Sequence, residues 1–210
     1  MELSCAVGIR PWETPELTAL NRLPPRATLV PYPTEAAARR GAFAGSRYWR
    51  SLNGSWDFRL YARPEDVPAE VLREPAVPRR EPAERLDASA GSGGWSQIEV
   101  PGNWTRQGYD RPHYTNVVMP FPNDPPRVPD DNPTGVYRTA FELPPAWEPR
   151  RTVLHLDGVE SCCWVYCNGS LVGMSKDSRL AAQFDLTPHL RPGRNSLAIV
   201  VIRWSDGSYV

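Results

Sequence analysis

Apolar and polar residues alternate over residues 55–60, where Trp56, Phe58 and Leu60 are separated by Asp57 and Arg59. A period of two predicts a half-buried β-strand. Similar short segments, bounded by Pro, Gly, Asn and Asp, predict further strands at 95–100, 136–143, 152–156, 162–167, 171–175, 184–186 and 196–204. The last segment is apolar on both sides, so we expect it to lie centrally between two layers.

The connections between these segments favour antiparallel pairing. Asn168-Gly169 forms a two-residue loop between two predicted strands, which is the strongest short-range signal for a hairpin. About seven to nine antiparallel strands with few helices and long loops predict an all-β fold, a jelly-roll β-sandwich. We assign this sandwich to residues 51–210.

Residues 1–50 lack a sustained strand period and are interrupted by prolines. We expect an extended N-terminal arm that lies over a surface and makes assembly contacts. One short helix is predicted in it at 34–40, capped by Thr34 and ended by Gly41.

Two long connections interrupt the predicted sandwich. Residues 62–94 are a mixture of Pro, Glu, Arg and Gly that predicts a long loop or insert. Residues 101–135 are also irregular, but they are rich in aromatic, Asn and Asp residues. Loops of this length in compact domains are usually functional or disordered, and the aromatic content favours an ordered, functional loop.

Composition and charge exclude several function classes. The 24 basic and 24 acidic residues balance, which argues against a nucleic-acid surface or a polybasic membrane patch. No apolar run approaches the ~20 residues of a membrane span, and the start lacks a secretory signal pattern. We therefore expect a cytoplasmic protein. Three of the four cysteines fall at 162, 163 and 167, a clustering that favours reduced, structural thiols.

The sequence offers no catalytic residue that we can assign. A glycosidase usually needs two carboxylates ~5–9.5 Å apart, and no Asp or Glu here lies in a motif that marks a nucleophile or an acid. The three histidines lack a Gly-x-Ser-x-Gly partner motif. We expect any catalytic pair to lie outside this chain.

A series of short motifs carries a family resemblance. In order, they are Trp12-Glu13, Leu20-Asn21-Arg22-Leu23, Pro101-Gly102-Asn103-Trp104, Gly108-Tyr109-Asp110, Tyr114-Thr115-Asn116-Val117, Asp131-Asn132-Pro133-Thr134-Gly135, Asp177-Ser178-Arg179 and Arg203-Trp204-Ser205-Asp206-Gly207-Ser208-Tyr209. Together they resemble the N-terminal sugar-binding domain of family 2 glycoside hydrolases, with the closest match to large bacterial β-galactosidases. The resemblance implies a galactose-binding-domain-like jelly roll at the start of a longer enzyme.

That resemblance implies an activity and its partners. The full-length enzyme would hydrolyse terminal, non-reducing β-D-galactose residues of lactose-type β-galactosides with retention, using two glutamates outside this chain. It would bind magnesium and sodium, and it would assemble as a homo-oligomer, a tetramer in relatives.

The resemblance also implies roles for individual residues. The matching asparagine in β-galactosidases reaches the substrate, so Asn116 is the main substrate-binding candidate and the neighbouring Val117 a weaker one. The counterpart of Asp206 helps to hold a structural magnesium ion. Here that site departs from the pattern, because Lys176 stands where a glutamine is expected, so a pairing of Asp206 with Lys176 or Arg179 is the alternative.

Two other functions remain open. A stand-alone carbohydrate-binding module would use aromatic residues as a stacking platform, with Trp104, Tyr109, Tyr114 and Trp147 as candidates. An inactive fragment is the third possibility, because the sequence stops at Val210, soon after the last predicted strand.

Overall fold

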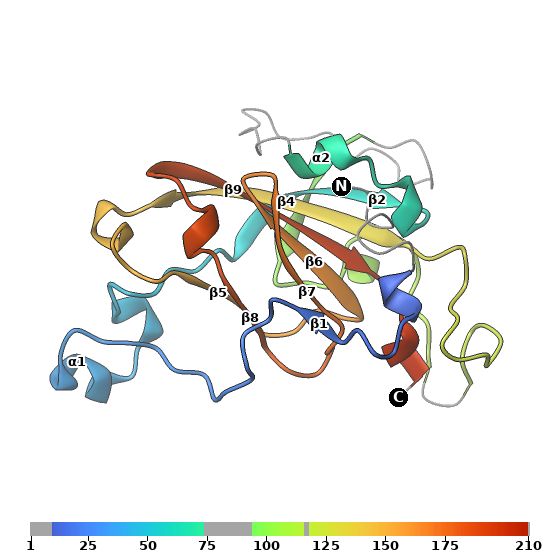
Figure 1. The fold of residues 1–210 in the computed structure, drawn as a ribbon, viewed down its shortest axis with the longest axis horizontal. Helices are drawn as coiled ribbons and strands as arrows, with labels where there is room; N and C mark the ends of the chain where they lie inside the picture. Colours follow the sequence, from blue (N-terminus) through green and yellow to red (C-terminus); the bar gives the residue numbers. More distant parts are fainter. Residues whose placement is uncertain (1–9, 74–93, 116–117, 210) are drawn as a thin grey trace.

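The computed structural model describes residues 10–73, 94–115 and 118–209. Its main layer is a seven-stranded antiparallel sheet in the order β1-β7-β6-β9-β4-β2-β3 (Figure 1). The strands of this sheet are β1 (Ala19–Leu20), β2 (Gly54–Tyr61), β3 (Ser96–Val100), β4 (Thr134–Leu143), β6 (Cys162–Cys167), β7 (Ser170–Ser175) and β9 (Gly193–Ile202). A smaller sheet pairs β5 (Val153–Leu156) with β8 (Ala182–Asp185). The predicted all-β sandwich is confirmed.

The helices of the described residues are short. The two α-helices are α1 (Glu35–Arg40) and α2 (Ala69–Arg73). The 3-10 helices are η1 (Pro11–Glu13), η2 (Phe43–Gly45), η3 (Pro64–Asp66), η4 (Trp104–Arg106), η5 (Pro145–Trp147), η6 (Thr187–His189) and η7 (Asp206–Tyr209). No helix within these described segments has the length and apolar character of a membrane span.

The central position predicted for the last long strand is confirmed. β9 pairs with β4 over its full length and with β6 on its other side. Both of its faces are buried because each carries apolar residues: Val200 and Ile202 on one, Leu197 and Ile199 on the other. The strand therefore separates two hydrophobic clusters.

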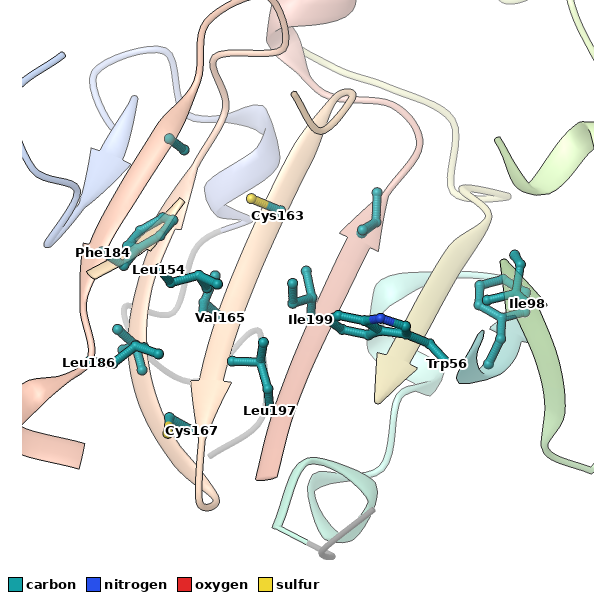
Figure 2. Packing of buried hydrophobic residues seen from close by; sticks show 14 of the residues in the cluster. Trp56, Ile98, Leu154, Cys163, Val165, Cys167, Phe184, Leu186, Leu197 and Ile199 are labelled. Atoms are coloured by element: carbon teal, nitrogen blue, oxygen red, sulfur yellow. The ribbon is translucent and has the colours of Figure 1, made fainter. Parts of the chain in front are cut away.

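These clusters lie on the two faces of the large sheet. The outer cluster gathers Trp12 from the N-terminal segment with Val71 and Leu72 of α2. The inner cluster lies between the two sheets, where Leu154 of β5 and Phe184 of β8 pack beside Val165 (Figure 2). The three cysteines of β6 alternate between the clusters: Cys162 belongs to the outer one, Cys163 and Cys167 to the inner one. All three are free thiols, as predicted.

Local signals predicted the N-terminal helix and the hairpin well. Thr34 caps α1 by accepting a bond from the Ala37 amide, and Gly41 ends it in the left-handed conformation. Asn168 and Gly169 both have positive φ, as the tight hairpin turn requires.

Several elements were not predicted, and three of them connect to the sandwich. β1 adds two residues of the N-terminal segment to the edge strand β7. Residues 64–73, expected to belong to a loop, form η3 and α2, and α2 packs its apolar side against the sheet. The N-terminal segment is thus tied to the sandwich over its first described part, while α1 projects away from it (Figure 1).

Candidate functional site

The candidate site is built on the long loop between β3 and β4, residues 101–133. Its start is held in the protein interior by η4, which Asn103 caps through the Thr105 amide. Trp104 is 6% exposed and packs in the inner cluster, against Phe58 and Tyr137. A Cβ at Gly135 would lie 2.7 Å from the rings of Phe58 and Trp104, so glycine is required where the loop rejoins the sheet. The loop therefore begins and ends on a rigid base.

A buried ion pair supports the middle of this loop. The Arg203 guanidinium contacts the Asp110 carboxylate, and both side chains are mostly buried. A second guanidinium nitrogen of Arg203 lies 2.7 Å from His113 Nδ1. Burial lowers the pKa of Arg203 from its ordinary value. Since Arg203 follows β9 directly, it joins the loop to the central strand.

The end of the loop is fixed by a buried asparagine. Asn132 donates from Nδ2 to the Trp204 carbonyl and accepts from the Trp204 amide, both at 2.9 Å. Its exposure of 1% makes these bonds costly to lose. Phe121 packs edge-on against both Trp204 and Tyr209, and the Tyr209 hydroxyl donates to the Pro122 carbonyl. The motif 203–209 thus buttresses the loop.

The N-terminal segment holds the same loop from another direction. Arg10 donates to Asp130 at 2.7 Å, and the Glu13 carboxylate accepts from the Val128 amide at 3.0 Å. With the loop, these residues line a cleft of about 870 Å³. Three of its lining carboxylates, Asp110, Asp124 and Asp130, each pair with an arginine. The Asp110 pair is mostly buried, whereas the Asp124 and Asp130 side chains are exposed.

The two substrate-binding candidates, Asn116 and Val117, lie outside the described residues. Close to them in the loop are Tyr114, 77% exposed, and Val118, 72% exposed. Large apolar side chains so exposed on one loop are typical of a surface that meets a ligand or another domain. The role of Asn116 and Val117 stays a prediction.

Asp206 is paired with an internal cation. The Lys176 ammonium lies 2.6 Å from Asp206 Oδ2 and donates to the Thr14 carbonyl at 2.7 Å. Both side chains are buried, at 4% and 10% exposure. The expected pairing with Lys176 is therefore observed, whereas Arg179 lies near Glu160. An ammonium against the carboxylate does not fit magnesium, which requires an octahedral shell of oxygens. The described residues also contain no cluster of three His, Cys, Asp or Glu side chains suited to a metal.

The aromatic candidates do not form one stacking platform. Trp104 is buried, and Tyr109 packs on Phe58 within the inner cluster. The Trp147 indole donates to the Arg47 carbonyl, and Trp147 lines the same cleft as the buried Trp104. Only Tyr114 of the four is strongly exposed. These positions do not favour a stand-alone carbohydrate-binding module.

Sequence reasoning missed the residues that hold the loop. Arg203 is separated along the chain by 90 positions from His113 and by more from Asp110, and nothing in the local sequence indicates these contacts. Asn132 sits in an Asp-Asn-Pro run that resembles an ordinary turn. Its two bonds to the Trp204 backbone show a structural clamp. Chemically, the loop can present polar and aromatic groups to a sugar, while its charged residues are used for support.

Comparisons with known proteins find similar chains. The chain is 44% identical over 209 residues to a β-galactosidase of Psychromonas ingrahamii, covering 100% of this chain and 19% of that protein. It is 43% identical over 211 residues to a β-galactosidase of Enterobacter cloacae, with the same coverage. Among solved structures, a Bifidobacterium dentium β-glucuronidase complexed with coumarin-3-O-glucuronide is 24% identical, at a TM-score of 0.48, over 72% of this chain and 19% of that one.

The matches also give the chain's share of its relatives and its family. The chain spans about a fifth of the length of the curated relatives. Residues 49–210 match the family described as glycosyl hydrolases family 2, sugar binding domain. This match covers most of the chain, including every strand of the sandwich except β1. The chain therefore belongs to glycosyl hydrolase family 2, as its sugar binding domain.

Proposed function

We propose that this chain is the N-terminal portion of a β-galactosidase that hydrolyses terminal, non-reducing β-D-galactose residues of β-galactosides. The observation that carries the proposal is identity of 43–44% over the whole chain to proteins named β-galactosidase. The matched region spans the whole chain, so it includes the loop and the residues that support it. Retaining hydrolysis needs two carboxylates, and we place both in the polypeptide beyond the matched fifth.

The part played by this chain is to bring a loop to the substrate. Asn116 offers both donors and acceptors to a sugar hydroxyl, and Val117 is a weaker contact. Arg203 supports the middle of the loop and Asn132 fixes its end, which lowers the entropy lost when the loop meets the sugar. The partners are thus the β-galactoside and the rest of the β-galactosidase polypeptide.

The full-length enzyme is expected to bind magnesium and sodium, and in this proposal both ions bind outside this chain. The position beside Asp206 is assigned to the Lys176 ammonium instead. A tetrameric homo-oligomer and a cytoplasmic location complete the proposal.

A complementation assay tests the role of Asn116. The purified chain is mixed with the Psychromonas relative from which the matched segment has been removed, and hydrolysis of a chromogenic β-galactoside is followed. Asn116→Ala is expected to lower kcat/KM about tenfold, the effect of one lost hydrogen bond in the transition state. Asn123→Ala, an exposed asparagine of the same loop, serves as the control. Equal activity of both variants would contradict the role given to Asn116.

A further inference from the structure

The loop contains a single histidine, His113, whose ring meets the two residues that follow β9. A guanidinium nitrogen of Arg203 lies 2.7 Å from His113 Nδ1. The imidazole also lies edge-on to the Trp204 indole, with 5.9 Å between the ring centroids. His113 therefore ties the loop to the end of the central strand, at a position three residues before Asn116 in the sequence.

The bond to Arg203 fixes the protonation state of the His113 ring. A guanidinium has N–H donors and no acceptor, and it stays protonated in proteins. His113 Nδ1 must therefore accept this hydrogen bond, and an imidazole nitrogen accepts only when it carries no proton. The contact requires the neutral ring, with its proton on Nε2. Protonation of Nδ1 would remove the acceptor and place two cations against each other.

The charged groups around His113 decide which partner moves when its ring is protonated. The Arg203 side chain is 12% exposed and is held by the Asp110 carboxylate, whereas His113 is exposed. From the N-terminal segment, Arg10 and Glu13 line the cleft of about 870 Å³ beside the ring and pair with each other at 3.5 Å. The other charged side chains of that cleft are exposed and belong to the loop: Arg111, Asp124, Arg127, Asp130 and Asp131. Since Arg203 keeps a buried partner, we expect the imidazolium to leave, together with its part of the loop.

We propose that His113 is a positioning residue for substrate binding: its neutral imidazole anchors the loop on Arg203, and its protonation releases that anchor. This role rests on the proposed function, because it assumes that the loop brings Asn116 to the sugar. Histidine side chains ordinarily change charge between about pH 5 and 8, so the anchor makes sugar binding depend on pH in this range. The β-galactoside binds best where the ring is neutral, and its affinity falls as the pH decreases.

NMR on the 210-residue chain measures the ring contact directly. At about pH 8, nuclear Overhauser effects are expected between the ring protons of His113 and Trp204, since the two rings are in contact. These effects should be lost as the pH falls toward about 5, in step with the shift of the His113 ring protons that reports protonation. His189→Gln, which changes a histidine of η6, is the control and should leave the titration unaltered. Effects that persist when the His113 ring is fully protonated would overturn the proposal.

The complementation assay with the Psychromonas relative then gives KM and kcat over the same pH range. His113→Leu lacks an acceptor, so it should raise KM about fivefold at about pH 8, with kcat nearly unchanged. His113→Gln offers Oε1 to Arg203 and cannot be protonated. It should match the unaltered chain at about pH 8 and have the lower KM at about pH 5. The KM values of the unaltered chain and His113→Leu should converge at the lower pH, which a merely structural role would not produce.

The two measurements separate this role from the proposed function. Equal KM values for the three chains at every pH would overturn the role of His113 while leaving the β-galactosidase activity in place. No hydrolysis by the mixture at any pH would overturn the proposed function, and with it the role of His113 toward the sugar. The NMR measurement involves neither sugar nor hydrolysis and uses the unaltered chain, so its result depends on neither the activity nor the folding of a variant.

Discussion

Replacing Lys176 tests the internal cation that joins three parts of the chain. The ammonium bonds to the Asp206 carboxylate at 2.6 Å and the Thr14 carbonyl at 2.7 Å, so it links β7, η7 and the N-terminal segment. Lys176→Met keeps the aliphatic stem but leaves a carboxylate that is 10% exposed without its counter-ion. Breaking a buried pair in this way costs about 3–5 kcal/mol, a large fraction of the ~5–15 kcal/mol of a typical domain.

Urea unfolding followed by tryptophan fluorescence measures this loss. Arg179→Met is the matched control, because its exposed partner Glu160 is 3.8 Å away and such pairs contribute less than about 1 kcal/mol. The double variant Lys176→Met/Asp206→Leu should recover most of the loss, since an apolar replacement removes both buried charges. A cost below about 1 kcal/mol for Lys176→Met would refute the reasoning.

Metal removal gives a second measurement on the same pair. Since the ammonium already neutralises Asp206, neither EDTA nor added Mg²⁺ is expected to shift the thermal midpoint of the 210-residue chain. A ligand that binds the folded state alone would raise stability in proportion to the logarithm of its concentration. A midpoint that rises with Mg²⁺ and falls with EDTA would show that a metal binds there after all.

Three further changes probe other parts of the structure. Gly173→Ala should lower the free energy of unfolding by about 1–3 kcal/mol, because its Cβ would lie 2.4 Å from a carbonyl oxygen of β1. Gly94→Ala is the control: its Cβ meets nothing within 4 Å, so the same urea assay should show no change. Burial raises the pKa of the Cys163 thiol to about 12 from an ordinary 9.0. The folded state therefore keeps a proton that the unfolded state loses, and the free energy of unfolding should fall as pH rises from about 9 to 12. In Cys163→Ala this fall should be less steep. Arg203→Ala leaves the Asp110 carboxylate without its counter-ion and should lower the free energy of unfolding by roughly 3 kcal/mol. The double variant Arg203→Ala/Asp110→Ala should lose less stability than the two single variants added together, which a double-mutant cycle measures.

Elements whose signals are local could be predicted from the sequence. Thr34 and Gly41 bracket α1 within a few residues, and Asn168-Gly169 fixes a hairpin turn by its own backbone preference. The period of two in β2 and the apolar run of β9 also follow from neighbouring residues. β1 was missed because two residues cannot show a period. α2 was missed because its five residues lie between proline-rich stretches, and packing against the sheet stabilises so short a helix.

Most contacts of the candidate site could not be predicted from the sequence. The sequence motifs indicated which loop to examine, but the contacts that hold this loop join residues far apart along the chain. Arg203 meets Asp110 and His113 only after β9 and the loop are placed side by side. The pairing of Lys176 with Asp206 could be predicted from charge alone, since a lysine near an aspartate competes with a metal ion for the carboxylate. Its buried bond to the Thr14 carbonyl required the folded structure.

The most direct test of the account is hydrolysis of a chromogenic β-galactoside by the purified chain, alone and mixed with the Psychromonas β-galactosidase lacking its own matched segment. We expect no hydrolysis by either component alone and measurable hydrolysis by the mixture, because we place the catalytic carboxylates outside the sugar binding domain. Hydrolysis by the chain alone would contradict the proposal that both catalytic carboxylates lie outside it. No hydrolysis by a mixture in which the two parts are shown to associate would contradict the claim that this domain helps to complete the active site.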